Sequence, residues 1–84
     1  MSRKKILVVD DNRVVLMTTS MKLTGAGYDV VTAEDGGEAI SAVRREKPDL
    51  IVQVADAKNL RRTLLITSQL VEFGIPMVLV LNMI

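Results

Sequence analysis

The sequence predicts one α/β domain built on a parallel sheet, and three observations indicate this fold. The chain has 84 residues, and single domains usually contain about 50 to 250. Four aliphatic runs alternate along it with three segments of helical periodicity. Strands that alternate with helices usually pair in parallel through right-handed crossovers. We therefore expect the element order βαβαβαβ, with four strands and three helices.

The first strand is expected at residues 5–10, where a continuous aliphatic run is typical of a strand buried on both faces. A helix is expected over residues 12–24, and it ends at the glycines that follow. The predicted buried stripe of this helix consists of Val15, Thr19, Leu23 and Ala26. Residues 28–33 predict the second strand.

The second helix is expected to begin with a capping box, because Glu38 follows three residues after Asp35. Pro48 ends that helix, since a proline disfavours helical geometry in the residue before it. Residues 50–54 then predict the third strand.

A third helix is expected between a capping Asn59 and a closing Gly74, and residues 76–81 predict the fourth strand. The predicted apolar stripe of this helix consists of Leu60, Leu64, Thr67, Val71 and Phe73. Right-handed crossovers favour the strand order 2-1-3-4 of a flavodoxin-like sheet. The first helix then covers one face of the sheet, and the other two cover the opposite face.

The composition excludes several classes of function. The chain has no Cys and no His, which removes disulfides, zinc fingers, Cys nucleophiles and Ser-His-Asp triads. Its net charge is +1 and two residues are aromatic, so nothing favours a nucleic-acid partner. The longest apolar stretch, residues 75–81, is far shorter than the roughly 20 residues that span a bilayer. We expect a soluble, cytoplasmic protein with no membrane partner.

An acidic pair, Asp10 and Asp11, ends the first predicted strand. Open α/β sheets bind ligands at this edge, and two adjacent carboxylates there favour a hard cation such as Mg²⁺. The alternative is structural, because Asp11 or Asn12 would also cap the helix that follows.

Four segments carry a family pattern: residues 4–12 (KKILVVDDN), 27–36 (GYDVVTAEDG), 38–40 (EAI) and 47–51 (KPDLI). Over about residues 3–52 the chain closely resembles a response-regulator receiver domain (CheY-like). The resemblance implies phosphoryl transfer from a histidine kinase to an Asp that ends the third strand. It also implies Mg²⁺ held by the acidic pair, a hydroxyl on the fourth strand and a Lys on a fifth.

The phosphoacceptor position of that family falls on Val54, and the hydroxyl position falls near Leu81. The chain is expected to end before a fifth strand, so the family's Lys has no counterpart. A receiver without its nucleophile does not form the aspartyl phosphate. Asp56 is the nearest carboxylate, and it is either a loop or cap residue or part of a residual acidic pocket. The predicted metal-binding residues are Asp10, Asp11 and Asp56, with at most weak Mg²⁺ binding and no other cofactor.

The sequence from the third strand onward has a second resemblance. Residues 49–62 (DLIVQVADAKNLRR) and 69–83 (QLVEFGIPMVLVLNM) are similar to the GTP-binding domain of the ferrous iron transport protein B family. In that family the stretch forms an interior strand, a helix and the strand before the guanine-specificity loop, whose Asn corresponds to Asn82. The phosphate-binding Gly-x-x-x-x-Gly-Lys-Ser/Thr motif is absent, because the chain contains no Gly-Lys pair. We expect no nucleotide binding.

Two families thus match two abutting segments, and both place the junction on a buried parallel strand. We interpret residues 1–84 as one chimeric domain, with a receiver-like part (1–51) and a GTPase-derived part (52–84). The predicted function is that of an engineered chimera, not an enzyme, made to study fold relationships. The alternatives are a degenerate or truncated receiver in two-component phosphorelay signalling and, third, a nucleotide-binding remnant.

The chain is also expected to bind itself, as a homodimer or a higher homo-oligomer. One face of the sheet would carry a single helix, which leaves apolar side chains in water, and the fourth strand would be an apolar edge. The first helix also has apolar side chains outside its predicted stripe. The predicted self-association residues are Leu16, Met17, Met21, Val78 and Val80.

Overall fold

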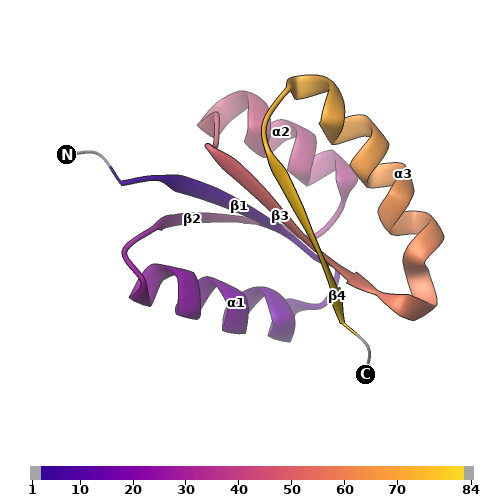
Figure 1. Ribbon diagram of the computed structural model, residues 1–84, viewed down its shortest axis with the longest axis horizontal. Coiled ribbons are helices and arrows are strands. Elements are labelled where there is room, and N and C mark those ends of the chain that lie inside the picture. The colour runs from indigo at the N-terminus through magenta and orange to yellow at the C-terminus, as the bar shows by residue number, and fades with distance from the viewer. Residues whose placement is uncertain (1–2, 83–84) are drawn as a thin grey trace.

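The computed structural model describes residues 3–82, apart from the side chains of Asn59 and Asn82. The predicted cap at Asn59 and the predicted loop residue Asn82 therefore lie outside the described side chains. Figure 1 shows the arrangement of the elements. The elements are β1 (Lys5–Val9), α1 (Arg13–Gly25), β2 (Asp29–Ala33), α2 (Gly36–Glu46), β3 (Leu50–Asp56), the 3₁₀ turn η1 (Ala57–Asn59), α3 (Leu60–Leu70), the 3₁₀ turn η2 (Val71–Phe73) and β4 (Met77–Asn82).

The sheet has the predicted topology. Its four strands pair in parallel in the order β2-β1-β3-β4. The helix α1 lies on one side of the sheet, and α2 and α3 lie on the other (Figure 1). This strand order confirms the flavodoxin-like prediction. The prediction succeeded because buried parallel strands joined by right-handed crossovers favour this arrangement.

The ends of the first two helices follow the predicted local chemistry. The Asn12 side chain caps α1 by accepting from the backbone N–H of Val14 at 2.9 Å. Asp35 caps α2 by accepting from the N–H of Glu38 at 2.8 Å. The carboxylate of Glu38 reaches back to the N–H of Glu34 at 3.2 Å, one residue before the usual partner in a capping box.

Each face of the sheet has its own apolar core. The larger core lies on the face covered by α2 and α3, and its buried residues come from the sheet and from both helices. They are Leu7, Val9, Ala33, Ala39, Ala42, Val43, Ile51 and Leu70. The smaller core under α1 consists of Ile6, Val8, Leu16 and Val54. Among the described residues, no helix has the length and hydropathy needed to cross a membrane.

The buried stripe of α1 differs from the prediction at one important position. Leu16 is 5% exposed and packs against Ile6 and Val8, whereas Ala26 is exposed. The prediction that Leu16 takes part in self-association is therefore wrong. It failed because the helix turns Leu16 directly onto the sheet, next to the half-buried Val15.

The predicted apolar stripe of α3 is right in part. Thr67 and Phe73 are half-buried, but Leu60, Leu64 and Val71 are exposed, and the helix turns Thr63 and Leu70 inward. The physical reason lies on β3, where the Gln53 side chain is 2% exposed and must be hydrogen bonded. The amide of Gln53 donates to the carbonyl oxygen of Thr63 at 3.1 Å, and the Thr67 hydroxyl donates to the Gln53 amide oxygen at 2.5 Å. These bonds fix which side of α3 faces the sheet.

Candidate functional site

The candidate site lies at the carboxyl ends of β1 and β3, where parallel α/β sheets present their ligand-binding loops. Asp10 and Asp11 follow β1, and Asp56 ends β3. All three line two small neighbouring cavities of about 30 and 70 Å³. We refer to these three carboxylates as the acidic pocket. The three residues that the sequence analysis singled out therefore line the same two cavities.

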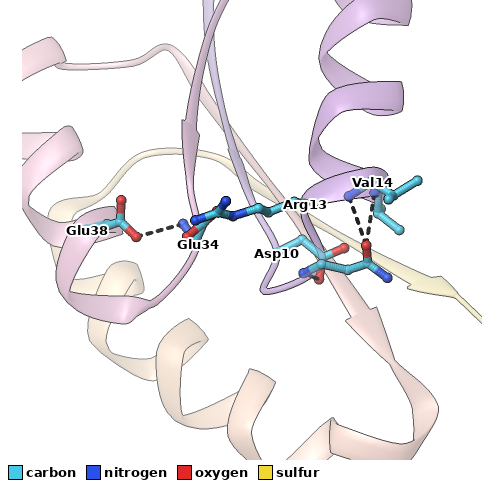
Figure 2. Close-up of polar contacts among 7 residues, drawn as sticks. Asp10, Arg13, Val14, Glu34 and Glu38 are labelled. Atoms are coloured by element: carbon cyan, nitrogen blue, oxygen red, sulfur yellow. Dashed lines mark hydrogen bonds and ion pairs between the residues drawn. The ribbon is translucent and has the colours of Figure 1, made fainter.

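Asp10 is held at the base of this pocket. Its side chain is largely buried, and its Oδ1 accepts from the backbone N–H of Asn12 at 3.3 Å. Figure 2 shows Asp10 beside the start of α1, close to the ion pair between Arg13 and Glu34, whose Nε and Oε1 lie 2.6 Å apart. Burial raises the pKa of Asp10, the N–H of Asn12 opposes that rise, and the neighbouring Asp11 adds to it.

The other two carboxylates already have partners. The Oδ1 of Asp56 accepts from the backbone N–H of Lys58 at 3.0 Å and so caps the turn η1. The Oδ2 of Asp11 lies 4.0 Å from Nη1 of Arg62, which comes from α3. Asp56 is thus both a cap residue, as the structural alternative proposed, and a member of the acidic pocket.

Val54 occupies the position where a receiver carries its phosphoacceptor. Its side chain is 9% exposed and lines both cavities of the acidic pocket. It packs with Ile6, Val8 and Leu16 in the core under α1. A saturated side chain in this place has no lone pair to attack phosphorus, so the pocket contains carboxylates but no group at the nucleophile position.

The hydroxyl position of the receiver pattern is apolar as well. Leu81 pairs with Ala55 near the end of β4, and its side chain is about half exposed. Leu81 offers neither a donor nor an acceptor, so this described side chain contributes no hydrogen bond at that position.

The receiver fold implies a Mg²⁺ ion, and the residues present do not fit one. Within residues 3–82, no three acidic side chains are gathered closely enough to hold a metal ion. Two neighbouring carboxylates remain, while Val54 stands in the place of the third. Mg²⁺ demands near-octahedral oxygen coordination, which this set does not supply.

Two residues at the site were missed by sequence reasoning. Gln53 lies in the aliphatic run of β3, and a polar amide inside such a run is the signal that could have marked a buried hydrogen-bonding position. Arg62 lines the pocket beside Asp11. Nothing in the local sequence indicates that contact, because it depends on how α3 crosses β3.

The predicted self-association residues other than Leu16 do lie at the surface. Met17 and Met21 on α1 are 65% and 69% exposed, and Val78 and Val80 on β4 are 46% and 42% exposed. Val78 and Val80 pair in register with Val52 and Val54. They therefore face the α1 side of the sheet, beyond the part that α1 covers.

Known proteins resemble this chain in two ways. A family model described as Ferrous iron transport protein B matches residues 9–84. The match begins well before residue 49, where the predicted similarity to that family starts. The order of aliphatic strands and helices is continuous over this wider range, and a parallel α/β family would share it.

Several relatives are receivers. The alkaline phosphatase synthesis transcriptional regulatory protein PhoP of Bacillus subtilis is 53% identical over 49 residues, which are 58% of this chain and 20% of that protein. A CheY-like receiver domain protein from Methanospirillum hungatei has a TM-score of 0.75 at 26% identity, covering 99% of this chain and 67% of that one. A response regulator from Thermotoga maritima has a TM-score of 0.80 at 22% identity, covering 99% and 70%.

These likenesses support a receiver fold over nearly the whole chain. The chain spans about a fifth of the length of this PhoP protein and of two other curated relatives that it matches. The family model, by contrast, accounts for most of the chain in one continuous match. With the fold of a receiver domain, this chain belongs to the ferrous iron transport protein B family.

Proposed function

We propose that this protein is an engineered chimera without catalytic activity. It joins a receiver part (residues 1–51) to a part from a GTP-binding domain (residues 52–84), and it serves the study of how two α/β folds are related. The observation that carries the proposal is Val54, which places an apolar side chain at the phosphoacceptor position beside an intact acidic pair. Natural recombination would rarely keep Asp10 and Asp11 and lose the group that they serve.

The position of the junction supports the proposal. The strand β3 pairs with β1 on one side and with β4 on the other. A splice within β3 therefore preserves one interior strand that both parent folds use. The receiver pattern ends at about Val52, one residue into the second part, within that strand.

The proposal includes several expectations about partners. We expect no nucleotide binding, because the chain has no Gly-Lys pair to cradle phosphates. The near-balanced charge and the low aromatic content support the absence of a nucleic-acid partner. We also expect a cytoplasmic protein that has no membrane partner.

The test is incubation with acetyl phosphate and Mg²⁺, followed by intact-mass measurement. The expected result is no phosphoryl adduct, while a receiver that retains its acceptor Asp, treated in parallel, gains one. A stoichiometric adduct on this chain would contradict the proposal. Loss of that adduct in Asp56→Asn, but not in Asp35→Asn, would locate it in the acidic pocket.

A degenerate receiver in a two-component phosphorelay is the second candidate. The observation that favours it is that Asp56 lines the same cavities as Asp10 and Asp11. Asp56 would then replace the missing acceptor two residues further along the chain. The same mass measurement separates the candidates, and titration with GTP tests the third reading, a nucleotide-binding remnant.

A further inference from the structure

The outer edge of β4 differs from every other part of the sheet. β4 is the last strand in the order β2-β1-β3-β4, and β3 is its neighbour on one side. Its side chains are exposed on both faces of the sheet, and no residue from 73 to 84 carries a charge. Four of these side chains are 42–52% exposed: Val78, Leu79, Val80 and Leu81.

The hydrogen-bonding direction of β4 follows from its register. The N–H of Ile51 donates to the carbonyl oxygen of Pro76 at 2.9 Å, and Ile51 pairs with Met77. In a parallel ladder this arrangement turns the peptide groups of residues 76, 78 and 80 toward β3. The N–H and C=O groups of Met77, Leu79 and Leu81 therefore point outward, away from the sheet.

The two edges of the sheet are built differently. β2, the opposite edge, carries the exposed polar residues Asp29 and Thr32. Natural edges are protected from pairing by charges, prolines, bulges or covering segments. Within the described residues, β4 has none of these devices between Met77 and Leu81. It is an unprotected strand about 20 Å long.

We propose that β4 pairs in antiparallel fashion with β4 of a second copy of this chain, forming one continuous sheet of eight strands. Strand addition of this kind satisfies the outward N–H and C=O groups and covers the side chains beside them. A twofold axis perpendicular to the sheet relates the two copies, so the same surface serves both. This axis keeps Val78 and Val80 of both copies on one face of the joined sheet, and Leu79 and Leu81 of both copies on the other face.

The charge and the size of this side of the molecule favour a second copy as the partner. Because the strand is uncharged, two copies meet without bringing like charges together. β4 lies at the front in Figure 1, on the broad side of the molecule, whose extents are 39 and 27 Å. A specific interface covers about 800 Å² per partner, and these extents leave room for a contact of that size.

Docking over the exposed side of α1 is the competing arrangement. It would cover Met17 and Met21 together with Val78 and Val80, which face the same side of the sheet. It would leave Leu79 and Leu81 in water on the opposite face. Pairing at the edge covers all four β4 side chains and the outward peptide groups, so the observations favour the edge.

The experiment measures the solution mass of the full chain and its variants by sedimentation velocity at micromolar concentration. The chain of 9.2 kDa is expected to sediment at twice that mass. Leu79→Pro is expected to be a folded monomer, because it removes an outward N–H and no hydrogen bond to β3. Leu81→Lys, which places a charge on the edge, is expected to be monomeric as well.

Met21→Lys is the matched control. It adds the same charge at a side chain that is 69% exposed on α1, and it is expected to stay dimeric. Circular dichroism confirms that each variant is folded, and Leu81→Lys decides the question if Leu79→Pro is not. A monomeric parent chain would overturn the proposal. So would a dimer that survives Leu81→Lys and is broken by Met21→Lys, since that result assigns the contact to α1.

Discussion

Residues 3–51 and residues 52–82 share one interior but have very different surfaces. Of the twelve large hydrophobic side chains that are exposed among the described residues, four lie in the first region and eight in the second, shorter one. Three ion pairs lie within the first region: Lys5–Glu46, Arg13–Glu34 and Arg45–Glu46. The fourth ion pair, Asp11–Arg62, joins the two regions. The surface of residues 52–82 is thus much more apolar than the surface of residues 3–51.

The interior shows no such division. The core on the α2 and α3 side combines Leu7 and Val43 from the first region with Leu70 from the second. The strand β3 is hydrogen bonded to both regions. The two regions thus share one core and one sheet, although the surface of the second region is far more apolar than that of the first.

The largest expected effect tests whether the shared interior is one cooperative unit. Leu7 and Leu70 are both fully buried in the same core. We expect Leu7→Ala and Leu70→Ala each to lower the free energy of unfolding by about 2 to 5 kcal/mol. A domain of this length has a total of about 4 to 13 kcal/mol, so either variant is close to unfolding. Urea denaturation followed by circular dichroism measures the change.

Leu64→Ala is the control, since Leu64 is 52% exposed on α3, and it should change the free energy of unfolding by less than about 0.5 kcal/mol. If Leu70→Ala cost as little as the control, or if unfolding had two separate transitions, the two regions would not share one core. The contrast between interior and surface would then be wrong.

The next effect concerns the carboxylate that a receiver carries at the position where this chain has Val54. Val54→Asp adds a carboxylate to the acidic pocket at the phosphoacceptor position of a receiver, where the Val54 side chain is 9% exposed. Without Mg²⁺ we expect a loss of about 3 kcal/mol or more, because a buried charge lacks a partner there. Millimolar Mg²⁺ should recover much of this loss by binding the folded state. Thermal melts with and without MgCl₂ measure both changes.

Val54→Asn, which has a similar shape and no charge, should respond much less to Mg²⁺. If the melting temperature of Val54→Asp did not change with Mg²⁺, the acidic pair would not be placed as in a working receiver. An equally large Mg²⁺ response in the parent chain would show that Asp56 already completes a site, contrary to the fit described above.

Much of the fold could be predicted from the sequence because its signals are local. The aliphatic runs, the capping side chains of Asn12 and Asp35, and the break at Pro48 placed the four strands and the first two helices to within about two residues. The third helix was expected to run to Gly74, but α3 ends at Leu70 and the turn η2 follows it, and the turn η1 was not predicted. The acidic pocket was also predictable, since the carboxyl ends of neighbouring parallel strands must meet at one edge.

The errors concern which side of each helix faces the sheet. The stripe predicted for α3 included Thr67 but also Leu60 and Leu64, whereas the buried Gln53 requires Thr63 to face the sheet beside Thr67. In α1, Leu16 lies inward and Met17 outward, although both are apolar. Periodicity alone does not distinguish two apolar neighbours on a helix that has apolar residues on several sides. That choice depends on contacts between distant parts of the chain.

The smallest expected effect concerns the pH dependence of stability at two carboxylates of the first region, the buried Asp10 and the ion-paired Glu46. Burial raises the pKa of Asp10 above its ordinary value of 3.8, so the folded state disfavours the charged form. The resulting cost to stability is fully present above the folded pKa and disappears below 3.8. Glu46 has the opposite sign, because hydrogen bonds from Arg45 and Lys5 lower its pKa below 4.5. Its contribution to stability is present above 4.5 and is lost as the pH falls through the lower folded value.

Asp10→Asn should therefore be slightly more stable than the parent chain at pH 7, because it removes a buried charge beside Asp11 and keeps an oxygen for the N–H of Asn12. The advantage should shrink as the pH falls and vanish below pH 3.8, where Asp10 is protonated in both states. Glu46→Gln is the opposing control and should be slightly less stable at pH 7. Midpoints of thermal unfolding between pH 3 and pH 8 measure both variants. If Asp10→Asn were less stable at pH 7, Arg62 and the N–H of Asn12 would stabilise the charge of Asp10 by more than its burial costs. The acidic pocket would then be a balanced site that joins the two regions.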